Sequence, residues 1–192
     1  MSLLNKRNYE TLAGRYSTPD SMIHSIGLGS PAASSAAGAL AATALTASVQ
    51  TIITGLTNPD VPRNATVTGN ASGIAGNAVV SGLNDEGVTI SETIALNGTA
   101  TVAGNKAFAS IISVQLPVET HGSGDTVSVG FGTKLGIGVR LSRDSTVAAY
   151  NNGVKESSAP TVTFDPVTFE NNTITLASSL AGHPIIVDFY RS

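Results

Sequence analysis

The sequence predicts an all-β protein, a single β-sandwich or barrel-like domain preceded by a long, mostly extended N-terminal arm. From residue 49 onward, short β-branched runs alternate with turn residues roughly every 8–15 positions, a spacing typical of sandwiches and barrels. Before residue 49 the chain is first polar and then Ala-rich, without the apolar periodicity of an amphipathic helix. We therefore expect an arm and Ala-rich linker over residues 1–48 and a β domain over residues 49–192.

The first 29 residues are polar and mixed, which favours an arm. Basic residues occur near the start, but no apolar stretch follows them as it would in a secretory signal. Large or charged side chains that could anchor such an arm on a partner are irregularly spaced. The candidate partner contacts in the arm are Tyr9, Arg15, Tyr16, Met22 and Ile23.

The segment Ser30–Ser48 is a low-complexity stretch rich in Ala. Alanine favours a helix, whereas Gly38 and the Ser and Thr residues weaken it, so a short helix and an extended linker both remain open. Its small side chains cannot fill a core alone, and the segment must lie against something or stay mobile.

The strands are expected where β-branched and apolar residues cluster. In the run after Val88, Ile90 and Ile94 share one face with Val88, and Glu92 interrupts this face, as at an edge or an interface. The expected strands are Gln50–Thr54, Ala65–Thr68, Ala78–Ser81, Val88–Ala95, Thr99–Val102, Ser110–Leu116, Thr126–Phe131, Val147–Tyr150, Thr161–Phe164, Thr173–Leu176 and Ile185–Tyr190.

Turn residues separate these runs. Asn97-Gly98, the segment 84–87 and Asn151-Asn152-Gly153 contain residues that tolerate a positive φ and suit hairpins. Two prolines between residues 58 and 63 remove backbone donors and restrict the residues before them, which predicts a rigid corner. We expect this corner to be the hinge between arm and body, formed by Asn58, Pro59, Asp60, Pro62 and Arg63.

Composition limits the classes of function. Charged residues make up 12% of the chain, about half of the roughly 25% that is usual, so much of the surface is expected to be covered by partners or by Thr and Ser. The net charge of −3 and the scattered cations argue against nucleic-acid binding. There is no cysteine, and no apolar run is long enough for a membrane span, so we expect folding in a reducing cytoplasm and no membrane partner.

The sequence shows no strong catalytic, cofactor or metal signature, and we expect a protein that is not an enzyme. The three histidines are far apart, and His121 lies in a Gly-rich loop with Ser123 and Asp125 that reads as an ordinary turn. The glycines of 130–136 lack dinucleotide-loop spacing and predict a strand bend or bulge. The carboxylates, most clearly Asp85-Glu86, are interpreted as solvated turn residues.

Four segments together resemble a family of tailed-bacteriophage virion proteins: Thr57–Asn64, Ile94–Thr99, Gly104–Phe108 and Gly124–Gly130. The resemblance covers the chain from about Val49 to the C-terminus. It implies a structural component of the virion, most like a head decoration or cement protein that binds the outside of the major capsid protein lattice. The expected partners are therefore the major capsid protein and further copies of this chain, as a homotrimer, with the arm clasping neighbouring subunits.

Two other functions remain open. A tail tube, neck or connector subunit would stack through exposed strand edges. A carbohydrate-binding receptor module would use loops of the β domain, although the chain has no Trp to stack on sugars. Assembly in the host cytoplasm and location on the capsid surface are expected from the leading hypothesis.

Overall fold

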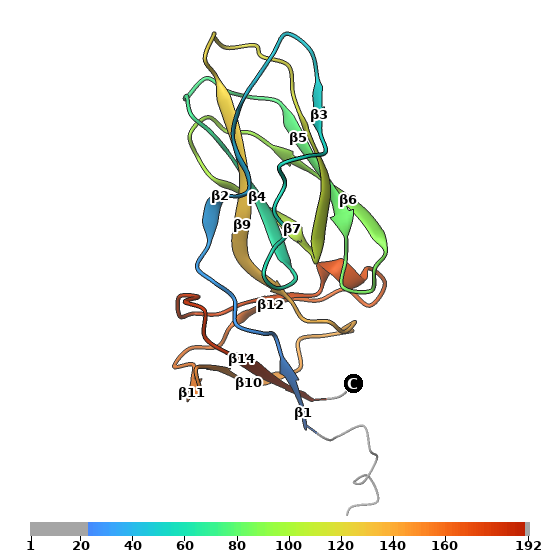
Figure 1. Cartoon of the computed structure of the whole chain (residues 1–192). Coiled ribbons are helices and arrows are strands. Elements are labelled where there is room, and N and C mark those ends of the chain that lie inside the picture. Colours follow the sequence, from blue (N-terminus) through green and yellow to red (C-terminus); the bar gives the residue numbers. More distant parts are fainter. Residues whose placement is uncertain (1–22, 191–192) are drawn as a thin grey trace, which may run out of the picture.

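The computed structural model describes residues 23–190, and these form an all-β fold. All paired strands are antiparallel and lie in three sheets, which curl into a half-barrel (Figure 1). The all-β prediction is therefore confirmed. One turn of 3₁₀ helix, η2 (Phe169–Asn171), lies between the last strands.

The three sheets are named here by their position. The terminal sheet has the order β1 (Ile23–Gly27), β14 (Ile185–Tyr190), β10 (Thr146–Asn151) and β11 (Val154–Lys155). The hairpin sheet has the order β3 (Gln50–Ile52), β8 (Ser110–Leu116), β5 (Asn77–Leu83) and β6 (Thr89–Ala95). The long sheet has the order β12 (Thr161–Thr163), β13 (Thr173–Thr175), β9 (Thr126–Gly136), β4 (Arg63–Gly69) and β7 (Val102–Phe108), and β2 (Ser35–Ala44) also pairs with β9.

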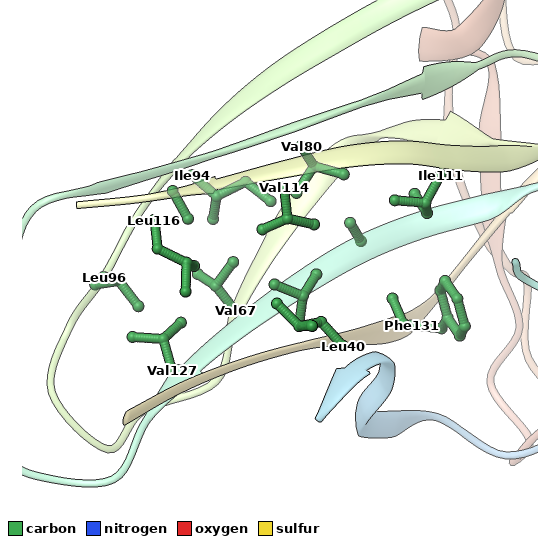
Figure 2. Close-up of a cluster of buried hydrophobic side chains, with 14 of the residues drawn as sticks. Leu40, Val67, Val80, Ile94, Leu96, Ile111, Val114, Leu116, Val127 and Phe131 are labelled. Carbon is green, nitrogen blue, oxygen red and sulfur yellow. The ribbon is translucent and has the colours of Figure 1, made fainter. Parts of the chain in front are cut away.

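A first core fills the space between the long and hairpin sheets (Figure 2). Alternation along the strands directs one face inward, so Ala65 and Val67 of β4 are fully buried while Thr66 points to the other face. Val80 and Val114 meet them from the hairpin sheet and are also fully buried. The core is small and mostly aliphatic.

A second core lies between the far end of β9 and the terminal sheet. Leu135 near the end of β9 and Ile137 just after it pack with Val187 and Phe189 of β14, and all four are at most 2% exposed. The first half of β9 supplies Val127, Val129 and Phe131 to the first core. One strand thus contributes to both cores.

The predicted bend among the glycines of β9 is present as a bulge. Ala65 of β4 lies opposite Phe131, but Arg63 lies opposite Leu135, so β9 carries extra residues between these two pairs. A Cβ on Gly132 would collide with the side chain of Asn64. Glycine is needed here because the neighbouring chain approaches so closely.

The predicted arm and linker over residues 1–48 is wrong for residues 23–48, because these residues belong to the β body. The Ala-rich segment contains β2, with Ala39, Leu40 and Leu45 buried in the first core, and β1 pairs with β14. The physical reason is close packing, because Gly38 lies directly against the ring of Phe131 and leaves no room for a Cβ. Small side chains allow β2 to lie against β9.

Glu92 closes the seam between the hairpin and long sheets. Ile90 and Ile94 on the same face of β6 are buried in the first core, as the alternation predicts. The Glu92 carboxylate accepts hydrogen bonds from the backbone N–H groups of Asn105, at 2.6 Å, and Lys106, at 3.2 Å. The Glu92 side chain thereby pairs two backbone N–H groups on the edge of β7 that no neighbouring strand of the described fold reaches.

The strand boundaries follow the prediction closely for Ser110–Leu116 and Ile185–Tyr190, but the expected strand Thr99–Val102 is wrong. In its place, Asn97 to Ala100 form a turn, closed by the Ala100 N–H bonding the Asn97 carbonyl, and β7 begins at Val102. The Asn152-Gly153 turn is confirmed: both residues have positive φ and connect β10 to β11.

Candidate functional site

The predicted hinge contains a buried arginine that joins three parts of the chain. Arg63 is 1% exposed. Its guanidinium donates to the Gly132 carbonyl in the β9 bulge, with the Nε bond at 2.8 Å, and its Nη1 donates to the Ala32 carbonyl at 3.0 Å and to Asp60 at 3.1 Å. A buried charge is tolerated because its donors are paired in this way.

Asp60 completes this cluster from the exposed side. Burial raises the pKa of its carboxyl, but the hydrogen bond from the Ala32 N–H and the pair with Arg63 outweigh that effect and hold the pKa below its usual value. The carboxylate is thus ionised, and it neutralises the buried guanidinium. Asp60 and Arg63 form a structural ion pair.

The hinge prediction needs correction in its location. Asn58 accepts a hydrogen bond from the Ile111 N–H at 2.9 Å, and the Pro62 carbonyl accepts one from Gly136 at 2.8 Å. The rigid corner is present, but it lies inside the body, since β2 and β3 before it already pair with β9 and β8. It therefore does not separate an arm from a domain.

The loop that holds His121, Ser123 and Asp125 forms a closed turn. Nδ1 of His121 lies 3.1 Å from Oδ2 of Asp125, and the Gly122 N–H donates to the same carboxylate. The Asn70 side chain also stabilises the turn, because it donates to the Gly124 carbonyl and accepts from the Thr126 N–H. Among residues 23–190, no group of three or more His, Cys, Asp or Glu side chains is placed to hold a metal ion.

Glu86 is an exposed turn residue, as the sequence predicts, and it also forms an ion pair with Arg140. Its carboxylate accepts two hydrogen bonds from the guanidinium of Arg140, at 2.6 and 2.8 Å. The bond to Glu86 raises the pKa of Arg140, and the guanidinium lies 5.1 Å from the centre of the Phe169 ring. The pair connects the hairpin-sheet turn to the segment after β9.

The outer face of the terminal sheet is the surface most suited to binding a macromolecule. Paired residues of antiparallel strands share a face, so Ile23 lies beside Tyr190, Ser25 beside Asp188, and Ile186 beside Tyr150. Ile23, Ile186 and Tyr190 are 52%, 42% and 48% exposed. Ser25 donates a hydrogen bond to Asp188 at 2.6 Å in the middle of this face.

We call this surface the terminal face: Ile23, Ser25, Gly27, Tyr150, Ile186, Asp188 and Tyr190. The terminal sheet that carries it lies at the end of the molecule away from β3 and β5 (Figure 1). Ile23 is the predicted arm contact that the structure places here. The other four, Tyr9, Arg15, Tyr16 and Met22, lie outside the described residues.

Sequence reasoning missed most of this face, although its signal was present. The run Ile185–Tyr190 alternates between buried and exposed side chains, and the exposed positions hold Ile186 and Tyr190. Large apolar residues on the outward face of a terminal strand indicate a contact surface. The partner strand β1 could not be inferred, because IHSIG is short and carries no regular pattern.

A groove of about 590 Å³ lies on the outer side of the long sheet. Hydroxyl-bearing residues line it, including Thr66, whose buried Oγ1 has no hydrogen-bond partner among the described residues. Lys134 at its rim donates to the Gly104 carbonyl and to Asn105. The ring of Phe131, which also borders it, is buried and offers no open platform on which a sugar could stack.

Comparisons with protein-family models, with curated proteins and with solved structures give no match to this chain. Within residues 23–190 there is also no helix of the length and apolar character needed to cross a membrane.

Proposed function

We propose that the chain is a structural subunit of a tailed-bacteriophage particle, a decoration protein that binds the outside of the major capsid lattice and stabilises the head. The observation that carries the proposal is the terminal face, an exposed apolar and aromatic surface at one end of the body. The resemblance of Thr57–Asn64 and the three later segments to virion proteins supplies the biological setting.

The chemistry of the terminal face suits a lasting contact. Tyr and Ile side chains bury much apolar area, worth about 25 cal/mol per Å², and the Tyr hydroxyls can still find hydrogen-bond partners. The Ser25–Asp188 pair adds a single polar point that can fix orientation. A rigid body behind this face reduces the entropy lost on binding.

The arm in this proposal is shorter than the sequence suggested. Strands β1 and β2 belong to the body, so the segment available to clasp a neighbouring subunit is residues 1–22. It contains four of the predicted anchors, namely Tyr9, Arg15, Tyr16 and Met22.

The location can be tested by labelling virions with an antibody raised against the chain. Labelling over the whole capsid supports a decoration protein. Labelling at one vertex or along the tail favours the tail tube, neck or connector alternative, in which exposed edges stack into rings. Virions that lack the chain altogether overturn both proposals.

A substitution on the terminal face tests the binding surface itself. Ile186→Asp places a charge at the centre of the apolar area and is expected to release the protein from particles at least tenfold more readily. Val167→Asp is the matched control, because Val167 is 81% exposed and lies outside the terminal face. Equal retention of both variants on particles contradicts the proposed surface.

A further inference from the structure

The edge strand β1 differs from the other edges of the described fold. Strands β3, β11 and β12 are at most three residues long, β2 is bulged against β9, and Glu92 closes the seam between β6 and β7. Short strands, bulges and charged side chains are the devices by which proteins prevent edge pairing. β1 is five residues long, IHSIG, and has no bulge, proline, carboxylate, lysine or arginine.

The backbone of β1 leaves three residues free to pair. The Leu28 N–H, just after β1, donates to the carbonyl of Ile185 in β14 at 2.9 Å. Backbone N–H and C=O groups point to alternate sides along an antiparallel strand. Those of Ile26 and His24 therefore also point toward β14, whereas those of Gly27, Ser25 and Ile23 point away from it. Among the described residues no strand lies beside this outer edge.

We propose that β1 pairs antiparallel with β1 of a second copy, about a two-fold axis through Ser25. In that register Ser25 lies opposite Ser25 of the second copy, and Ile23 lies opposite Gly27. Each of the three outward-facing residues of one strand then meets an outward-facing residue of the other, so all their backbone donors and acceptors are paired. The two terminal sheets join into one continuous sheet.

The side chains are self-complementary in this register. A Cβ added to Gly27 would meet no atom within 4 Å, so the terminal face has an empty position there. Ile23 of the second copy fills it and packs beside Ile186, while its own neighbour Tyr190 extends the apolar row. The knob at Ile23 and the vacancy at Gly27 occur on the same strand, as a two-fold contact requires.

Charge does not oppose the pairing. Among residues 23–190, the carboxylate that this face carries near the axis is that of Asp188, which already accepts a hydrogen bond from Ser25. The two copies of Asp188 stand three strand spacings apart, roughly 14 Å, which exceeds the screening length of about 8 Å at physiological salt. The axis is perpendicular to the sheet, so both terminal faces point the same way.

A double-mutant cycle tests the register by sedimentation equilibrium of the full chain. Ile23→Ala removes the knob and Gly27→Leu fills the vacancy, and each is expected to lower the association constant roughly tenfold or more. The double variant Ile23→Ala with Gly27→Leu exchanges knob and vacancy and is expected to recover most of the lost association. Both positions are exposed, so the subunit fold is retained. Additive losses in the double variant contradict the register.

Disulfide trapping provides the second measurement. The chain has no cysteine, so Ser25→Cys introduces a single thiol. The two Cα atoms would be about 5.5 Å apart, within the range that a disulfide spans. Mild oxidation should give a covalent dimer of Ser25→Cys far faster than of the control Ser91→Cys, an exposed serine on edge strand β6.

Equal trapping rates overturn the pairing, as does sedimentation of the unmodified chain as a monomer or as the trimer expected from the resemblance. The proposal does not rest on the decoration role. Loss of self-association in solution and loss of attachment to particles are separate readouts, so either proposal can fail alone.

Discussion

The two cores are built from different parts of the chain. The first core contains buried residues between Ala39 and Phe131. Its strands pair with near neighbours in sequence, such as β5 with β6, and with more distant strands, such as β2 with β9. The second core combines Leu28 with residues 135–189, and its sheet pairs the first described strand with the last. The pairing of β1 with β14 encloses a longer stretch of chain than the pairing of β2 with β9 does, so it costs more chain entropy to close.

The junction between the cores carries a buried polar side chain that bonds to three separate segments. Arg63 bonds the segment after β1, the corner at Asp60 and the bulge of β9, where the strand passes from one core to the other. The long and hairpin sheets enclose the first core with their own contacts, whereas the terminal sheet relies on this junction and on β9. Four experiments test this difference between the cores.

The largest effect is expected from Arg63→Met. The substitution leaves the Gly132 and Ala32 carbonyls without their donor and Asp60 without its counter-charge, so the free energy of unfolding should fall by about 3 kcal/mol or more. Urea unfolding measures this, and Arg143→Met at an exposed position is the control. If the variant and the control unfold at the same urea concentration, the hydrogen bonds of Arg63 do not stabilise the junction between the cores.

A matched pair of valines compares the cores directly. Val129 of β9 and Val187 of β14 are both fully buried, and each Val→Ala change should cost about 2–3 kcal/mol locally. Native-state hydrogen exchange should show faster exchange across the whole molecule for Val129→Ala, but only in the terminal sheet for Val187→Ala. The same exchange pattern in both variants would mean that the cores open as one unit.

Substitution of Glu92, which joins the hairpin and long sheets around the first core, should lower stability less than the valine substitutions do. Glu92→Ala removes the acceptor for two N–H groups of β7 and is expected to cost about 1–2 kcal/mol, measured by thermal unfolding. Glu92→Gln keeps an acceptor oxygen and should lose less. Equal losses in the two variants would show that charge, rather than hydrogen bonding, closes the seam.

The smallest effect concerns the turn before η2, next to the second core. Hydrogen bonds from the Thr168 N–H, from Asn171 and from the Val167 N–H lower the pKa of Asp165 to about 2. A lowered pKa contributes stability above the ordinary value of 3.8, and this is lost as pH falls toward 2. NMR titration should therefore show Asp165→Asn destabilising the turn at pH 7 and much less at pH 2. A difference that is as large at pH 2 as at pH 7 would contradict this origin.

The sequence predicted those parts of the fold where alternation and turn chemistry agree. The strand Ser110–Leu116, the buried Ile90 and Ile94, and the Asn152-Gly153 turn were found as expected. The Ala-rich β2 could not be predicted, because its strand conformation comes from packing small residues against β9 rather than from propensity. The buried role of Arg63 was equally hidden, since its partners are distant in sequence.

The candidate site was only partly predictable for the same reason. Ile23 was selected as an arm residue, yet its surroundings depend on the pairing of β1 with β14, across more than 160 positions of the chain. Ile186 and Tyr190 stand on a well-predicted strand, but only the structure shows that their face is uncovered among the described residues. Periodicity identifies strands, whereas exposure depends on which strands meet.

Strand β9 gives the molecule a specific mechanical behaviour. Its residues run without interruption from the first core to the second, and its hydrogen bonds to β4 span much of that length. A pull on the terminal sheet that acts along β9 would load many of these bonds together in shear, rather than opening them one after another. An attachment at this end would therefore resist tension along the long axis of β9 far better than a sideways peel.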